Sequence, residues 1–146
     1  MSADDAPVTV LSEDECWSLL SSMSLGRLVT VLGGEPEIFP VNFVTQRRTV
    51  LFRTAQGTKL YSAVMDNSVA FEADYHDPPL TYGWSVIIKG RANLLSATAD
   101  ILDAEEAPLR PWIATLKPIY VRVIPSEITG RRFKFGPEPD HETIIG

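Results

Sequence analysis

Cysteine, long apolar runs and a targeting segment are all scarce in this sequence. Its 146 residues contain one cysteine, Cys16, so no disulfide can form within the chain. No stretch approaches the roughly 20 apolar residues that a membrane-spanning helix needs. The acidic start, MSADDAPVTV, lacks the basic and apolar regions of a signal peptide. We therefore expect a soluble, cytoplasmic protein that does not bind a membrane.

Positive charge is also in short supply. The chain has 13 Lys and Arg against 19 Asp and Glu, which gives a formal net charge of −6. A general nucleic-acid binder needs a basic surface, so we expect no nucleic-acid partner. The balance is still compatible with a small local pocket for an anion.

Several cofactor and metal motifs are missing as well. There is no Gly-x-Gly-x-x-Gly dinucleotide fingerprint, and Phe52 stands where a P-loop ending at residues 57–59 would need its first glycine. The two histidines, His76 and His141, lie far apart, so four metal ligands at suitable spacing are not found. The sequence predicts neither a nucleotide triphosphatase nor a metal site.

What is present is a pattern of strands in hairpins with helices between them. Ser12 and Glu15 form a capping box that begins a helix ending near Gly26. Two further helices are expected over residues 58–65 and 97–107. Alternating apolar residues and turn signals predict six strands, at residues 27–32, 37–46, 49–54, 69–75, 84–95 and 120–124. Three strands in a row without a crossover favour a mainly β fold, a small antiparallel barrel with short inserted helices.

The two ends of the chain lie outside this pattern. Residues 1–10 are expected to be a flexible N-terminal arm, and residues 136–146 a Pro-rich, acidic C-terminal tail. A single domain of residues 11–135 is predicted between them.

Residues 51–60, LFRTAQGTKL, carry the strongest chemical signal. A strand ends in Arg53 and Thr54, and a helix begins at Thr58 and Lys59. Two cations, two hydroxyls and the free N–H groups of a helix start suit one phosphate group. The alternative is a capped turn whose cations are solvated.

Six segments, taken in order, resemble a known family. They are GRLVTV (26–31), PVNFV (40–44), LFRTAQGTKL (51–60), VAFEAD (69–74), WSVIIKGRA (84–92) and ITGRRF (128–133). Their order and spacing are similar to those of the pyridoxamine 5′-phosphate oxidase-like FMN-binding split barrels, in particular the branch with nitroimidazole-reductase-type proteins. The resemblance covers most of residues 11–135.

The resemblance implies a six-stranded antiparallel split β-barrel that forms a homodimer, with two FMN molecules at the subunit interface. By position, the residues implied to hold the flavin are Val41, Asn42 and Phe43 along the ring, Arg53, Thr54, Thr58 and Lys59 around the ribityl chain and phosphate, and Trp84 and Ser85 at the flavin edge. Several of these also have a purely structural reading, as core residues or surface charges. Leu60 departs from the family, because many members carry a second basic residue there.

The function implied is that of an FMN-dependent oxidoreductase, a flavoprotein that passes electrons from NAD(P)H to a small-molecule acceptor. No catalytic acid or base is identified in the sequence. Two alternatives stay open. One is a split-barrel protein without catalysis, which binds flavin or haem or has lost its cofactor. The other is a reductase that uses the deazaflavin F420.

Overall fold

The computed structural model describes residues 6–65 and 68–140. These residues form eight strands and three short helices. In chain order the elements are β1 (Val8–Val10), α1 (Glu13–Leu20), β2 (Leu25–Leu32), β3 (Glu35–Asn42), β4 (Val44–Gln46), β5 (Thr49–Thr54), α2 (Lys59–Val64), β6 (Ser68–His76), β7 (Tyr82–Leu94), α3 (Thr98–Glu105) and β8 (Ile119–Lys134). No helix in the described ranges is both long enough and apolar enough to cross a membrane.

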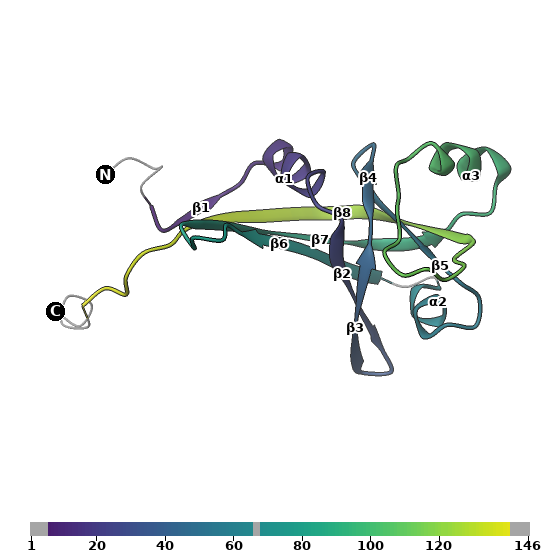
Figure 1. The fold of residues 1–146 in the computed structure, drawn as a ribbon. Coiled ribbons are helices and arrows are strands. Elements are labelled where there is room, and N and C mark those ends of the chain that lie inside the picture. Colours follow the sequence, from purple (N-terminus) through teal and green to yellow (C-terminus); the bar gives the residue numbers. More distant parts are fainter. Residues whose placement is uncertain (1–5, 66–67, 141–146) are drawn as a thin grey trace.

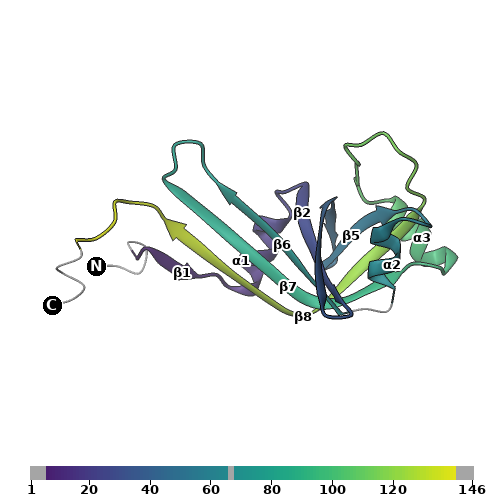
Figure 2. The same cartoon turned by 90° about the horizontal axis from the view of Figure 1, so that it is seen from below.

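All the strands belong to one antiparallel sheet that curls on itself (Figures 1 and 2). The strand order is β3-β2-β6-β7-β8-β5-β4, and β1 pairs with β8 outside this path. In Figure 2, α2 and α3 lie at one end of the sheet, and the hairpin of β6 and β7 lies at the other. The predicted mainly β, antiparallel fold with short helices is confirmed.

The predicted count of six strands is corrected to eight for the part of the chain that the structure describes. The stretch 37–46 was expected to be one strand, but it divides at Phe43. Before Phe43, β3 pairs with β2, and after it β4 pairs with β5. The buried Phe43 ring packs edge-on against Phe71, with the ring centroids 4.7 Å apart. The chain changes its pairing strand where it inserts this side chain into the core.

The eighth strand comes from the N-terminal end. Residues 8–10 lie in the stretch expected to be a flexible arm, yet they pair with Arg131 to Phe133 of β8. Residues 1–5 of that arm and residues 141–146 of the expected tail lie outside the described residues. Residues 136–140 form neither helix nor strand.

The pairing of β7 with β8 is the longest ladder of the sheet. It runs from Tyr82 opposite Lys134 to Leu94 opposite Val121, with a bulge between Lys89 and Gly90. β8 extends ten residues beyond its expected end at residue 124. Pro125 and the polar stretch after it hide the strand in the sequence, because proline and exposed polar residues weaken the strand signal.

The core lies on the concave face of the curl, where α1 and α2 also pack. Three helix residues, Cys16, Trp17 and Leu20, are buried against the sheet. Both predicted caps are confirmed: Ser12 and Glu15 form the capping box of α1, and Thr58 caps α2. The largest fully buried side chains include Phe43, Phe52, Phe71, Leu28 and Ile88.

An ionic cluster occupies the opposite face of the sheet. Arg27 of β2 donates from Nη1 to Glu72 Oε1 at 2.7 Å and to Asp74 Oδ2 at 3.1 Å on β6. Burial, followed by the neighbouring Asp74 carboxyl group, raises the pKa of Glu72 to about 7, although Arg27 opposes the shift. One guanidinium therefore does not compensate two carboxylates at neutral pH.

We expect Gly90→Ala to destabilise the fold. A Cβ atom at this position would lie 2.1 Å from the backbone oxygen of Ile124, at the bulge of the β7–β8 ladder. Overpacking of this kind costs about 1–3 kcal/mol. Urea unfolding should show the loss for Gly90→Ala and none for the control Gly136→Ala, where nothing lies within 4 Å. Equal stability of the two variants would contradict the packed bulge.

We expect stability to fall as the pH rises, through the ionisation of Glu72. Its pKa is raised from 4.5 to about 7, so the folded state binds the proton more tightly than the unfolded state does. The free energy of unfolding should therefore decrease between about pH 4.5 and 7, by roughly 1 kcal/mol after solvent screening. Glu72→Gln should remove this slope and unfold at higher temperature than wild type at pH 8. An unchanged pH profile in the variant would rule the cluster out as its origin.

Candidate functional site

A small pocket opens where β3, β5 and α2 meet the loop between α3 and β8. Its volume is about 90 Å³, and it is lined by Pro40, Val41, Asn42, Arg53, Leu60, Pro111, Ile113 and Lys117. We refer to it as the Arg53 pocket. Three of its residues, Val41, Asn42 and Arg53, are among those predicted from the sequence to hold a cofactor. Two cations, Arg53 and Lys117, share its lining.

The Arg53 side chain points away from the main core. On β5 the buried Phe52 and Thr54 face one side of the strand, so Arg53 faces the other. Its guanidinium lies over the ring of Tyr120 on β8, 5.7 Å from the ring centroid. Its Nε atom is buried and has no hydrogen-bond partner among the described residues. A buried donor without a partner costs about 1–3 kcal/mol, which a bound anion could recover.

A neighbouring arginine shows the contrast. Arg122 of β8 donates to Thr49 Oγ1 at 2.7 Å and to Gln46 Oε1 at 2.9 Å. Its guanidinium also lies 3.9 Å from the Asp103 carboxylate of α3. Burial lowers the pKa of Arg122 from its usual value, and the nearby charge of Arg47 adds to this effect. Arg122 is thus held by Thr49, Gln46 and Asp103. The Nε atom of Arg53, in contrast, has no hydrogen-bond partner among the described residues.

The Asp103 carboxylate holds α3 beside Arg122 and Arg47. Arg47 donates to both of its oxygens, and these bonds hold the pKa of Asp103 below its usual range. Gln46 Nε2 also donates to the Asp103 backbone oxygen at 3.0 Å. These contacts attach the end of α3, and so the start of the loop that follows it, to Gln46 and Arg47.

That loop supplies the second cation of the pocket. Asn42 Oδ1 accepts a hydrogen bond from the Trp112 backbone N–H at 2.8 Å, and Asn42 Nδ2 donates to the Ser24 backbone oxygen at 3.2 Å. Lys117 Nζ donates to Thr115 Oγ1 and to the Ile113 backbone oxygen. Asn42 thereby joins the loop to β3 beside the pocket.

Lys117 could not be predicted as a pocket residue, because it lies 64 residues after Arg53 in a loop without a motif. The residue after Lys59 is Leu60, which adds no charge to the lining of the pocket, and the second cation comes from Lys117.

Within the 51–60 stretch, Arg53 and Leu60 line the pocket, whereas Thr54, Thr58 and Lys59 do not. Thr54 Oγ1 is 3.1 Å from Thr58 Oγ1, which in turn accepts from the Tyr61 N–H and donates to the Ala55 backbone oxygen. Lys59 is largely exposed, and its Nζ lies 2.9 Å from Glu37 Oε1 of β3. The Lys59 ammonium thus forms an ion pair with Glu37, beside the Arg53 pocket.

Phe43, Trp84 and Ser85 lie elsewhere. Phe43 is a core residue, and Trp84 is buried near the start of β7. Val121 of β8 pairs with Leu94, at the end of β7, on one side and with Phe52 of β5 on the other. The end of β7 therefore lies near Arg53, which follows Phe52. Ten residues of strand separate Trp84 from Leu94, roughly 30 Å. One chain therefore does not bring Trp84 and Ser85 to the Arg53 pocket.

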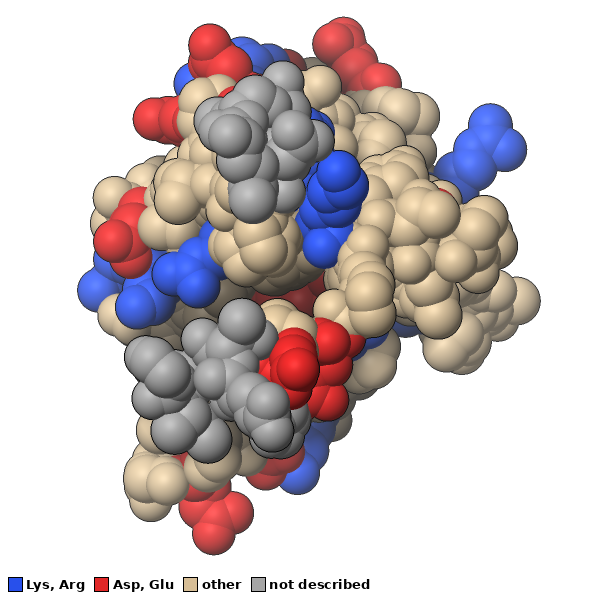
Figure 3. Space-filling view, turned by 90° about the vertical axis from the view of Figure 1, so that its left-hand side faces the viewer, with Lys and Arg blue, Asp and Glu red and all other residues tan. Residues whose placement is uncertain are grey.

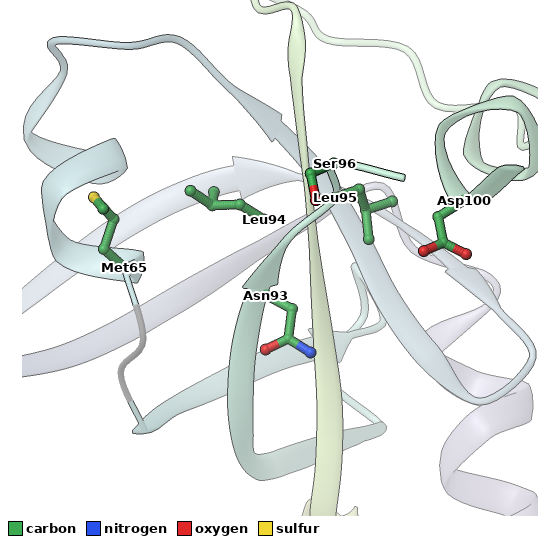
Figure 4. Close-up of a pocket in the computed structure, with 6 residues that line it drawn as sticks. All are labelled: Met65, Asn93, Leu94, Leu95, Ser96 and Asp100. Carbon is green, nitrogen blue, oxygen red and sulfur yellow. The ribbon is translucent and has the colours of Figure 1, made fainter. Parts of the chain in front are cut away.

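A larger hollow lies nearby but has the wrong chemistry for an anion (Figure 4). It has a volume of about 340 Å³ and is lined by Met65, Asn93, Leu94, Leu95, Ser96 and Asp100. Figure 4 shows Leu94 pointing toward Met65 of the α2 end, and Asp100 on α3 at the other side. The lining includes a carboxylate and, in the described part of the chain, no cation.

The face of the molecule at the end where the described termini lie carries charged side chains of both signs. Figure 3 shows basic and acidic side chains interspersed on this face. This mixture suits neither a polyanion nor a polycation. The two cations of the Arg53 pocket therefore stand out because one of them has a buried, unused donor, and not because of the overall charge.

The dimensions of the Arg53 pocket limit what it can hold. Pockets that bury a drug-sized ligand have volumes of about 300–1,000 Å³. A volume of about 90 Å³ is enough for a phosphate-sized group but not for a flavin ring. The residues present therefore fit the anionic end of a flavin nucleotide, and the ring would have to lie outside this pocket.

Comparison with known proteins gives concordant results. Residues 12–132 match the family model described as pyridoxamine 5′-phosphate oxidase. An uncharacterized protein of Mycobacterium tuberculosis is 61% identical over 97 residues, which cover 66% of this chain and 86% of the relative.

Solved structures agree. The FAD binding protein from Mycobacterium smegmatis is 56% identical, with a TM-score of 0.80, over 88% of this chain and 100% of that chain. A conserved protein of unknown function from Corynebacterium diphtheriae is 41% identical, with a TM-score of 0.75, over 88% of this chain and 99% of that chain. The resemblance seen in the six sequence segments is confirmed.

Proposed function

Because the chain belongs to the pyridoxamine 5′-phosphate oxidase family, we propose that it binds a flavin nucleotide and passes electrons from NAD(P)H to a small-molecule acceptor. The observation that carries the proposal is the buried Nε atom of Arg53, which lacks a partner among the described residues and lies in a phosphate-sized pocket with Lys117. A phosphate group would accept hydrogen bonds from both side chains.

The form of the flavin is the finer part of the proposal. The sequence predicts FMN, whereas the M. smegmatis relative is described as binding FAD. Both nucleotides carry a phosphate on the ribityl chain, so the Arg53 pocket suits either. A bound flavin would supply the redox chemistry, since hydride acceptance is a property of its ring. The chain would bind it, orient it and exclude water.

We also propose that the site is completed by a second copy of this chain. The Arg53 pocket leaves a flavin ring without cover, and Trp84 lies too far away to provide it within one chain. The outer face of the sheet exposes Val31, Ile38 and Ile87. Ile38 and its cross-strand neighbour Val29 share this face. An exposed apolar face of this kind suits a homodimer interface.

We expect the homodimer to be stable at micromolar concentration. An obligate two-fold interface should bury more than about 2,000 Å² in total. Light scattering should then give about twice the 16.1 kDa chain mass. The variant Ile38→Glu, on the exposed apolar face, should shift the mass toward one chain. A monomeric wild type that still binds flavin tightly would refute the shared site.

We expect Arg53→Ala to weaken FMN binding by about ten- to a hundred-fold, because hydrogen bonds to charged groups contribute about 1.5–3 kcal/mol. Riboflavin lacks the phosphate, so its affinity should be the same for wild type and variant. Quenching of flavin fluorescence measures both ligands.

The matched control is Arg48→Ala, which removes an exposed arginine whose ion pairs are with Glu13 and Asp14. It should leave FMN affinity unchanged. Lys59→Ala, measured in the same way, tests whether that ammonium leaves Glu37 for the phosphate. Equal FMN affinity for wild type and Arg53→Ala would exclude the Arg53 pocket as the phosphate site. A visible spectrum of the purified protein with a Soret band would point to haem instead.

A further inference from the structure

A second cavity lies between the β2–β3 hairpin and α2. Its volume is about 270 Å³, three times that of the Arg53 pocket. The residues that line it are Thr30, Leu32, Glu35, Glu37, Phe39, Lys59, Ser62 and Ala63. We refer to it as the Thr30 cavity.

Thr30 gives this cavity an unmet hydrogen-bonding group. It lies on β2, opposite Glu37 of β3, and is only 1% exposed. Its Oγ1 atom is buried and finds no partner within residues 6–65 and 68–140. Burying a hydroxyl group without a partner costs free energy, and a ligand that supplies a donor or acceptor removes that cost.

The walls and the rim of the cavity differ in chemistry. Leu32, Phe39 and Ala63 provide apolar surface, which suits a flat aromatic ring. The rim carries the carboxylates of Glu35 and Glu37, which can accept hydrogen bonds from ribose hydroxyls or from an amine. Acidic side chains bind ribose in this way in other nucleotide sites.

The Thr30 cavity and the Arg53 pocket are neighbours along one strand and one helix. Phe39 lines the cavity and Val41 lines the pocket, two residues apart on the same face of β3, or roughly 7 Å. On α2, Lys59 lines the cavity and the next residue, Leu60, lines the pocket. The Lys59 ammonium lies at the Thr30 cavity, 2.9 Å from the Glu37 carboxylate, one residue before the lining of the Arg53 pocket begins on α2.

We propose that the Thr30 cavity binds the adenosine half of a flavin dinucleotide, with its pyrophosphate passing Lys59 to the Arg53 pocket. The inference rests on the proposed flavin function and makes it more specific, because FMN has no group to fill this cavity. Phe39 packs against the adenine, Thr30 Oγ1 and the rim carboxylates bind its polar groups and the ribose, and Lys59 exchanges Glu37 for phosphate. Lys59 thus binds the phosphate groups of the dinucleotide, and the cavity binds its adenine base.

The variant Ser62→Trp tests the assignment by filling the cavity from its rim. Ser62 is exposed, so the larger side chain should not disturb folding. The matched control, Ser18→Trp, places the same side chain on the exposed side of α1. Dissociation constants are measured for FAD and FMN with the full-length protein. We expect Ser62→Trp to weaken FAD binding at least tenfold and to change FMN binding less than twofold, while Ser18→Trp changes neither.

A second variant, Thr30→Val, removes the hydroxyl group while keeping the side-chain shape. It should weaken FAD binding several-fold, leave FMN binding unchanged and leave the protein at least as stable. If Ser62→Trp weakens FAD and FMN alike, or weakens neither, the assignment is overturned. If wild type binds no flavin at all, the proposed function fails, and ADP decides the cavity. ADP binding that Ser62→Trp abolishes would support it, and the absence of ADP binding would overturn it.

Discussion

The pairing of β7 with β8 is the constraint on which the other elements depend. β8 uses one edge along nearly its whole length for β7. Its other edge is divided, with β5 paired to its first part and β1 to its last. Gly90 permits the bulge in this ladder, because a side chain there would meet the Ile124 carbonyl group. On the other edge of β8, the register with β5 brings Tyr120 opposite Arg53 and Arg122 opposite Leu51.

A second consequence of this register is the layer of polar side chains on the far face of β5 and β8. Arg122 is bound by Thr49 and Gln46 and lies close to Asp103, so it anchors β4, β5 and α3 together. Arg53 lies two positions away along the same face, where its guanidinium stacks over the ring of Tyr120. The same layer thus contains one arginine that holds the fold together and one whose buried Nε atom has no hydrogen-bond partner among the described residues.

The sequence was informative wherever local pattern determines structure. The alternation of Val69, Phe71 and Ala73 gave β6, and the two helix caps were correct. The second half of β8 was not predicted, because pairing with β7 and β1 makes it a strand and its own residues carry little strand signal. Arg53 was identified from its place at a strand end, whereas its burial depends on Tyr120, far along the chain. Thr30 gave no signal at all, since an unpaired hydroxyl becomes visible only once its neighbours are known.

The placement of β8 in the chain has a consequence for protein synthesis. β7, β5 and β1 all pair with β8, which is synthesised after the other strands of the described residues. Before β8 is made, β1 lacks the strand with which it pairs, and within the described residues β5 can pair only with the three residues of β4. Contacts between residues distant in sequence form slowly, and unpaired strand edges invite aggregation. The pairings of β1, β5 and β7 with β8 can therefore form only after residues 119–134 have been synthesised.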